Sequence, residues 1–301
     1  MDYQPAYLGL LKSGEFEDRI RSITRRLSSC DLCPRHCSVN RLKGETGHCG
    51  IGKKVLIASY GPHLGEEAPL RGWRGSGTIF FSGCNLSCIF CQNSDISQRR
   101  TGKPATGSEL AKIMLELQSR GCHNINLVSP THVISQITEA VYLAALSGLN
   151  LPIVYNSGGY DSIHVLKDLD GIIDIYMPDM KYSSGDVAEE LSGVGDYPEM
   201  NRMAVLEMHG QVGDLLLDRN GIALRGLLVR HLVLPNGRAG SSSILEFIAE
   251  QISKDTYLNI MDQYRPAYNA FQIESINRRI SGKEYQDVLD EANFLGLNRL
   301  D

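Results

Sequence analysis

Short apolar runs alternate with longer amphipathic stretches along most of this chain. The apolar runs are rich in β-branched and aromatic residues and are bounded by Gly, Pro or Asn, which is typical of buried strands. They predict six strands, at residues 79–81, 124–128, 152–155, 172–176, 226–234 and 256–260. A further short strand is predicted at residues 55–60, ahead of a loop rich in Gly and Pro.

Apolar residues at spacings of three and four predict helices between these strands. The first helix after a strand has a clear start, because Thr106 and Glu109 form a capping box at its amino end. An amphipathic helix is also predicted before the strands, at residues 13–27. The predicted inter-strand helices lie at residues 106–120, 133–146, 162–169, 200–212 and 243–253.

The order of these elements predicts an α/β fold. Repeated strand–helix units favour parallel strands with helices outside, and right-handed crossovers curl them into a partial (β/α)6 barrel of the TIM type. A doubly wound open sheet is the alternative. We expect two parts: residues 1–70, a helix with a cysteine-rich metal-binding module, and residues 71–301, the barrel with a helical C-terminal tail.

Composition and charge narrow the class of protein. With 301 residues, 42% of them apolar and 22% charged, the chain is long enough for a substantial core. A formal net charge of -5 argues against a nucleic-acid partner. The most apolar stretch, residues 140–155, is broken by polar residues and is shorter than the roughly 20 residues of a membrane span. Residues 1–11 do not resemble a signal peptide. We therefore expect a cytoplasmic protein with no membrane partner.

Three cysteines follow the strand at 79–81 with the spacing C-x3-C-x2-C: Cys84, Cys88 and Cys91. Three buried apolar thiols would be an unusual coincidence at this spacing, and a disulfide is disfavoured in a reducing compartment. Soft thiolates suit zinc or an iron–sulfur cluster. Since a closed site needs four protein ligands, this set either recruits a distant fourth ligand or leaves one metal position open.

A second set of cysteines precedes the first. Cys30, Cys33, Cys37 and Cys49 have the spacing C-x2-C-x3-C-x11-C and form a complete ligand set by themselves. They could bind an iron–sulfur cluster or a structural zinc ion. The spacing slightly favours the cluster, because it lacks the paired C-x2-C motifs of zinc ribbons.

Polar residues follow the predicted strands where the active site of an α/β barrel lies. These residues could also have purely structural roles, as helix caps or in glycine turns. Arg230 could form a buried ion pair with Asp174 or Asp179. The candidates for a binding role are Ser129, Thr131, His132, Asn156, Asp179, Lys181, Arg230 and Gln263.

The C-x3-C-x2-C motif on a loop after a first barrel strand resembles that of the radical S-adenosylmethionine (radical SAM) enzymes. The resemblance implies that Cys84, Cys88 and Cys91 bind three irons of a catalytic [4Fe–4S] cluster. S-adenosylmethionine would chelate the fourth iron, and its reductive cleavage would give a 5'-deoxyadenosyl radical that abstracts hydrogen from a substrate. A reductant such as flavodoxin or ferredoxin is implied as partner.

Further motifs resemble the activating enzymes of glycyl radical enzymes, in particular pyruvate formate-lyase activating enzyme, in a divergent branch with a cysteine-rich N-terminal motif. They are the Asn-Ser-Gly-Gly turn at Asn156, Asp179-Met-Lys181, and Arg230-His-Leu-Val-Leu-Pro. The resemblance implies that Lys181 contacts the carboxylate of S-adenosylmethionine. The usual Gly-Gly-Glu, which holds the amino group of the cofactor, is replaced by Ser129-Pro-Thr131-His132.

The substrate does not follow from this resemblance. A glycyl radical enzyme, another protein or peptide, and a small molecule are all compatible with the motifs. A non-catalytic iron–sulfur or zinc protein is the alternative from another class.

Overall fold

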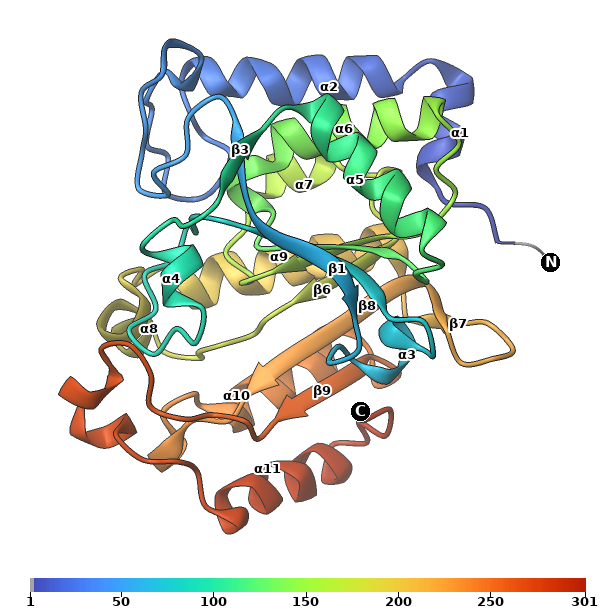
Figure 1. The fold of residues 1–301 in the computed structure, drawn as a ribbon. Coiled ribbons are helices and arrows are strands. Elements are labelled where there is room, and N and C mark those ends of the chain that lie inside the picture. The colour runs from blue at the N-terminus through green and yellow to red at the C-terminus, as the bar shows by residue number, and fades with distance from the viewer. Residues whose placement is uncertain (1–2) are drawn as a thin grey trace.

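Six parallel strands form the centre of the computed structural model, which describes residues 3–301 (Figure 1). Each strand pairs with the one before it among the six. The sheet confirms the expected partial barrel, with β2 at one end of the parallel series and β9 at the other. These strands are β2 (Ser76–Phe81), β4 (Ile125–Val128), β5 (Ile153–Ser157), β6 (Ile175–Pro178), β8 (Ala223–Leu232) and β9 (Tyr257–Met261).

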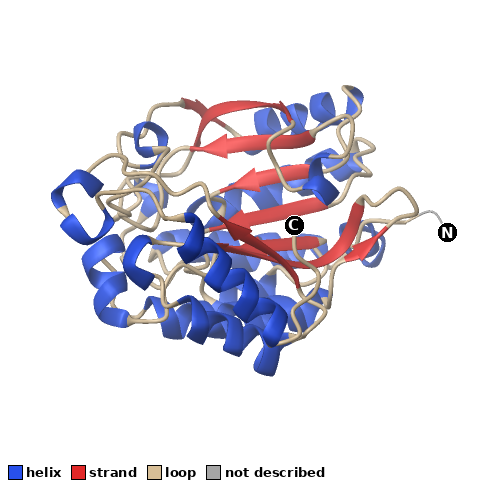
Figure 2. Cartoon of the chain, turned by 90° about the horizontal axis from the view of Figure 1, so that it is seen from below, coloured by secondary structure: helices blue, strands red, loops and turns tan. Residues whose placement is uncertain are grey.

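Helices connect the parallel strands, and Figure 2 shows most helices gathered on one side of the sheet. The capping box at Thr106 is present, with both reciprocal hydrogen bonds to Glu109. The connecting helices are α5 (Gly107–Ser119), α6 (Ile134–Leu146), α7 (Ile163–Asp168), α8 (Gly185–Ser192), α9 (Tyr197–Val212) and α10 (Ser241–Phe247), which continues as a π-helical turn (Ile248–Ile252). Helix α8 was not expected from the apolar pattern.

Three antiparallel strands extend the sheet beyond the parallel series. The strand expected at 55–60 is β1 (Val55–His63), which pairs with β2, and β3 (Lys103–Ala105) pairs with β1. A short β7 (Leu216–Leu217) pairs with β8. The chain segment before residue 70 thus contributes a strand to the sheet of the barrel, and the boundary at residue 70 stays a prediction.

The helix expected at 13–27 is present as α2 (Phe16–Arg25), which continues into a 3-10 turn (Arg26–Ser28), and a helix that was not expected, α1 (Tyr7–Ser13), precedes it. Gly14 separates them in the left-handed conformation, with φ of 80°, which glycine adopts without steric cost. Helix α2 packs on α6 (Figure 1), where the rings of Phe16 and Tyr142 meet edge to face at 5.5 Å. The N-terminal helices therefore share one hydrophobic core with the barrel.

The chain ends with the expected helical tail, α11 (Gly282–Phe294), whose capping box is formed by Ser281 and Glu284. Among the described residues, no helix is both long and apolar enough to cross a membrane. Two short α-helices, α3 (Ala68–Arg71) and α4 (Ser94–Ser97), lie in loops. Single 3-10 turns occur at Arg26–Ser28, Arg41–Lys43, Thr131–Val133, Pro235–Gly237, Ala270–Gln272 and Glu274–Ile276.

Asp174, just before β6, joins the N-terminal segment to the sheet. Its carboxylate accepts hydrogen bonds from the Tyr3 hydroxyl at 2.6 Å, the Ala6 backbone N–H at 2.8 Å and the Ile153 backbone N–H at 2.9 Å. The side chain is fully buried, and burial raises its pKa to about 6. One carboxylate thus satisfies donors from two parts of the chain that are far apart in sequence.

Replacing Asp174 by Ala is expected to lower the free energy of unfolding by about 2 kcal/mol, since it leaves the buried Ile153 N–H without an acceptor. Urea unfolding measures the loss. Asp170→Ala is the matched control, because Asp170 is exposed on the same loop. Equal stability of the two variants would contradict the anchoring role of Asp174.

Candidate active site

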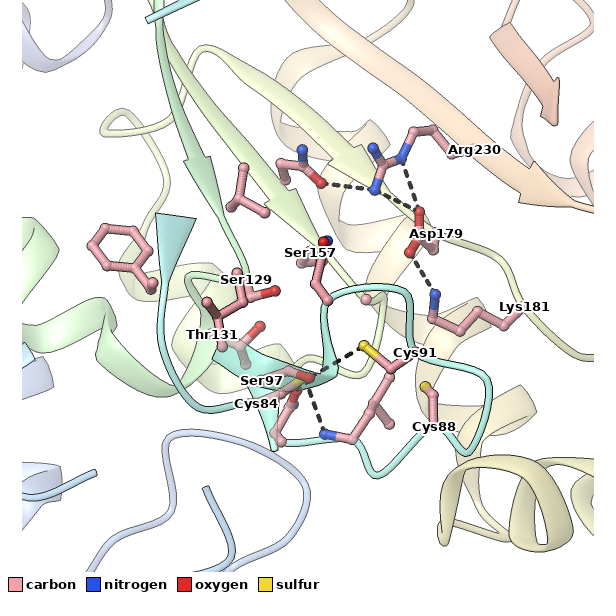
Figure 3. A pocket seen from close by; sticks show the side chains of 18 residues that line it. Cys84, Cys88, Cys91, Ser97, Ser129, Thr131, Ser157, Asp179, Lys181 and Arg230 are labelled. Atoms are coloured by element: carbon pink, nitrogen blue, oxygen red, sulfur yellow. Dashed lines mark hydrogen bonds and ion pairs between the residues drawn. The ribbon is translucent and has the colours of Figure 1, made fainter. Parts of the chain in front are cut away.

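The loop after β2 carries three cysteines into one cavity of about 180 Å³ (Figure 3). Gly83 begins the loop with φ of 82°. A Cβ at this position would lie 2.7 Å from the carbonyl oxygen of Cys49, so the approach of the two cysteine-bearing segments requires glycine. Cys84, Cys88 and Cys91 all line the cavity, as the spacing predicted.

Each of the three sulfurs already has a hydrogen-bonding neighbour. The backbone N–H of Leu86 donates to Cys84 Sγ at 3.4 Å, and the Ser192 hydroxyl donates to Cys88 Sγ at 2.9 Å. The Ser97 hydroxyl lies 3.2 Å from Cys91 Sγ. Donors of this kind stabilise thiolates and tune the metal that thiolates bind.

Burial strongly affects the acidity of these thiols. It raises the pKa of Cys84 to about 12, and it also raises the pKa of Cys88, although the ammonium group of Lys181 and the Ser192 hydroxyl act in the opposite direction. A thiol that coordinates a metal loses its proton outright. Metal loading of this cavity therefore releases protons.

The opposite wall of the cavity carries a charged network from β6 and β8. Asp179 accepts hydrogen bonds from Lys181 Nζ at 2.6 Å and from Arg230 Nε at 2.8 Å, and Arg230 Nη2 donates to Asn156 Oδ1 at 2.8 Å. Figure 3 shows this chain of contacts facing the cysteine loop. Of the two partners considered for Arg230, the structure places Asp179 beside it, whereas Asp174 binds the N-terminal segment.

Ion pairing affects the pKa values of Asp179 and Lys181 more strongly than burial does. Burial raises the pKa of Asp179, but Arg230 and Lys181 lower it further and hold the pKa below its usual value. Burial lowers the pKa of Lys181, yet Asp179 brings it above the ordinary value. All three groups are therefore charged near neutral pH, and the Lys181–Asp179–Arg230 network carries one net positive charge.

Two of the three residues expected after β4 line the same cavity, and the third does not. Ser129 lies there with φ of 57°, and Thr131 donates its hydroxyl hydrogen bond to Asp161 at 2.6 Å. His132 instead lines the cavity of Cys30, Cys33, Cys37 and Cys49, and its Nε2 lies 2.9 Å from the Ser82 carbonyl oxygen. Burial lowers its pKa to about 4, so the imidazole is neutral.

Gln263 lies in a neighbouring cavity of about 410 Å³. Its side-chain amide is 3.1 Å from the sulfur of Met261. Asn156 and Arg230 line both cavities, so the two spaces meet at these side chains.

Two side chains of α9 support the site and were not anticipated from the sequence. Tyr197 donates its hydroxyl hydrogen bond to the Gly158 and Asp179 carbonyl oxygens, at 2.9 Å each. Asn201 donates to the Gly159 and Asp179 carbonyl oxygens, also at 2.9 Å. Both residues lie on a helix far in sequence from the cysteine loop, and no motif around them indicates a role in the site. They hold the loops after β5 and β6 together.

The N-terminal cysteines Cys30, Cys33, Cys37 and Cys49 line a separate small cavity. Buried Arg41 also lines it, with Nη1 3.9 Å from Cys30 Sγ and 2.7 Å from the His132 carbonyl oxygen. Burial raises the pKa of Cys33 to about 12. No group of three or more His, Cys, Asp or Glu side chains within residues 3–301 is arranged to hold a single metal ion.

The two cysteine-lined cavities lie on either side of Asn85, which lines both. Arg35 from the N-terminal segment donates a hydrogen bond from Nε to the Asn85 carbonyl oxygen at 2.9 Å. His48 Nε2 lies 2.9 Å from the Ser87 hydroxyl. The N-terminal cysteine segment thus packs directly on the loop of Cys84, Cys88 and Cys91.

Sequence comparisons match this chain to a superfamily and to a relative. The sequence pattern of the radical SAM superfamily matches residues 78–208, which run from β2 into α9. Uncharacterized protein MJ0674 of Methanocaldococcus jannaschii is 33% identical over 283 residues, covering 90% of this chain and 76% of that protein.

The fold is similar to that of a solved structure at low sequence identity. A radical SAM methyltransferase from Sphaerobacter thermophilus superposes with a TM-score of 0.50 and 14% identity, over 74% of this chain and 65% of that one. Native anSMEcpe with bound AdoMet superposes with a TM-score of 0.47 and 13% identity, over 72% of this chain and 60% of that one. This chain therefore spans less than two thirds of the length of either solved structure. From the sequence match and the relative, we conclude that residues 78–208 form a radical SAM superfamily domain and that the chain belongs to one family with MJ0674.

Proposed function

We propose that this protein is a radical SAM enzyme whose catalytic [4Fe–4S] cluster is bound by Cys84, Cys88 and Cys91. The observation that carries the proposal is the convergence of these three thiols on one cavity whose opposite wall is the Lys181–Asp179–Arg230 network. The donor set fits the group, because the cavity supplies three soft ligands and leaves the fourth position to S-adenosylmethionine.

The chain's own residues orient the cofactor. Lys181 is a mostly buried point charge suited to the carboxylate of S-adenosylmethionine. Arg230, held by Asp179 and Asn156, adds a second fixed positive group. The hydroxyls of Ser129 and Thr131 are the polar groups available to the cofactor amino group on the β4 side. When bound, the cluster and S-adenosylmethionine together supply one-electron cleavage to methionine and a 5'-deoxyadenosyl radical, which takes a hydrogen atom from the substrate.

The substrate proposed from the motifs is a glycyl radical enzyme, as for pyruvate formate-lyase activating enzyme. Asp179, Lys181 and Arg230, which carry that resemblance, line the same cavity as the three cysteines. A peptide or a small molecule is the alternative substrate. The electron would come from a reductant such as flavodoxin or ferredoxin.

Cys30, Cys33, Cys37 and Cys49 are proposed to hold a second metal centre, a further iron–sulfur cluster or a zinc ion. Four thiols lining one cavity are a complete ligand set for a cluster, whereas a single zinc ion would require them to move closer together than they lie within residues 3–301. The guanidinium of buried Arg41 lies beside Cys30 and offsets part of the negative charge that four thiolates would bring.

Anaerobic reconstitution with iron and sulfide, followed by reduction in the presence of S-adenosylmethionine, tests the enzyme class. We expect 5'-deoxyadenosine from the wild type and none from Cys88→Ala, because Cys88 is a ligand of the catalytic cluster. Cys122→Ala is the control, since Cys122 is a buried thiol that lines neither cysteine cavity. A wild type that forms no 5'-deoxyadenosine would favour a non-catalytic iron–sulfur or zinc protein.

Lys181→Met is expected to weaken S-adenosylmethionine binding by about tenfold or more, the size of one lost charge-assisted hydrogen bond. Equilibrium binding to the reconstituted protein measures the change, and the iron content should stay at the wild-type level. Lys167→Met, at an exposed position of α7, is the control. Unchanged affinity in Lys181→Met would remove Lys181 from the cofactor site.

Metal analysis of the reconstituted protein tests the second centre. We expect about eight irons per chain, two [4Fe–4S] clusters, and about four in Cys33→Ala. About four irons with one zinc would identify the second centre as zinc. About four irons and no zinc in the wild type would contradict a second centre.

A further inference from the structure

The cavity beside the cysteine site is a separate recess on the side of the barrel that the parallel strands leave open. Phe80 of β2 lines it from one side, and Asn259 and Met261 of β9 line it from the other. Residues 63–67, between β1 and α3, complete its wall. At about 410 Å³ the recess is large enough for a small molecule or one extended side chain.

The recess opens directly onto the proposed reaction site. Asn93, Val128, Asn156 and Arg230 line both the recess and the cavity of the three cysteines. A group bound in the recess therefore lies next to the cavity in which the cofactor is proposed to react.

Carboxylates dominate the charge of the recess. Glu66, Glu67 and Asp301 line it, and Arg230 is the single lysine or arginine that does so in the described part of the chain. Since Arg230 is already paired with Asp179, its charge is largely committed to the inner network. The carboxylates leave the recess with a net negative charge that a positively charged ligand would offset.

Glu67 provides an independent indication of a ligand. The residue is 6% exposed, and its Oε1 accepts a hydrogen bond from Asn259 Nδ2 at 2.9 Å. Its Oε2 is buried and has no hydrogen-bond partner within residues 3–301. A buried carboxylate oxygen without a donor is costly, and a ligand N–H in the recess would supply the donor.

Glu66, which precedes Glu67 in the sequence, contacts His63. Its Oε1 lies 3.0 Å from His63 Nδ1, and its side chain is 8% exposed. Burial raises the pKa of Glu66, Arg230 lowers it and Glu67 raises it again. The negative charge of Glu67 therefore opposes ionisation of Glu66, and a cation in the recess would favour the ionised form of Glu66.

We propose that this recess binds a positively charged nitrogen of the substrate, an ammonium or guanidinium group, and so presents a neighbouring C–H bond to the reaction site. The inference rests on the proposed radical SAM function. The same chemistry is offered by a basic side chain of a peptide and by a small amine.

Binding of small probes tests the charge preference directly. Ligand-detected NMR on the reconstituted protein compares n-butylguanidine and n-butylamine with neutral n-butanol, both without S-adenosylmethionine and at its saturating concentration. We expect the cations to bind at least about tenfold more tightly than n-butanol, the discrimination expected of a charge-assisted hydrogen bond. A second comparison sets N-acetyl-lysine methylamide, which represents a lysine in a peptide, against n-butylamine, which represents a small amine. Tighter binding of the first indicates a peptide substrate and tighter binding of the second a small amine, and either result supports cation binding in the recess.

Glu67→Gln and Glu66→Gln are each expected to reduce this preference by about tenfold. Glutamine at position 67 keeps an acceptor for Asn259, and Glu66→Gln is a second variant if the first does not fold. Glu199→Gln, on the exposed face of α9, should bind as the wild type does. Equal binding of n-butanol and the cations, unchanged binding in both variants, or displacement of the probes by S-adenosylmethionine would overturn the inference.

Measuring the formation of 5'-deoxyadenosine without added substrate distinguishes a failure of the recess inference from a failure of the proposed function. If the wild type forms 5'-deoxyadenosine but shows no preference for cations, the recess inference fails alone. If it forms none, the proposed function fails, and the probe measurements made without S-adenosylmethionine still report on the recess.

Discussion

The interaction on which the site depends is the double ion pair of Asp179 with Lys181 and Arg230. The three side chains are mostly buried, with 12–19% of their surface exposed. A charge in such a place is unfavourable unless it is paired, and removing one member of a buried pair usually costs about 3–5 kcal/mol. The network thus restrains the ends of β6 and β8, where the Met180 backbone N–H also donates to the Arg230 carbonyl oxygen at 2.8 Å.

Around this network the molecule brings two cysteine segments into contact. The N-terminal segment packs on the loop of Cys84, Cys88 and Cys91 through Arg35 and His48. This loop has little regular structure of its own, so its shape depends on such neighbours. The N-terminal helices before the first cysteine segment share the hydrophobic core of the barrel.

The strand and helix pattern predicted most of the barrel, because buried parallel strands are recognisable as short apolar runs bounded by turns. Helix α8 was missed because Gly185–Ser192 is short and only weakly apolar. Helix α1 was missed because it is only seven residues long and ends at Gly14, just where the predicted helix begins.

The sequence by itself determined the order of six parallel strands, the three-cysteine loop after β2 and the resemblance to radical SAM enzymes. These features are local, since they depend on spacing and on residue type within a few positions. Only the folded chain shows that Arg230 pairs with Asp179 while Asp174 binds the N-terminal segment, and that His132 lines the cavity of the N-terminal cysteines. The same holds for Glu66 and Glu67, which line the recess together with Asn259 and Met261 of β9. The physical reason is that such contacts join residues far apart in the chain, and only the packing of the whole barrel fixes which of them meet.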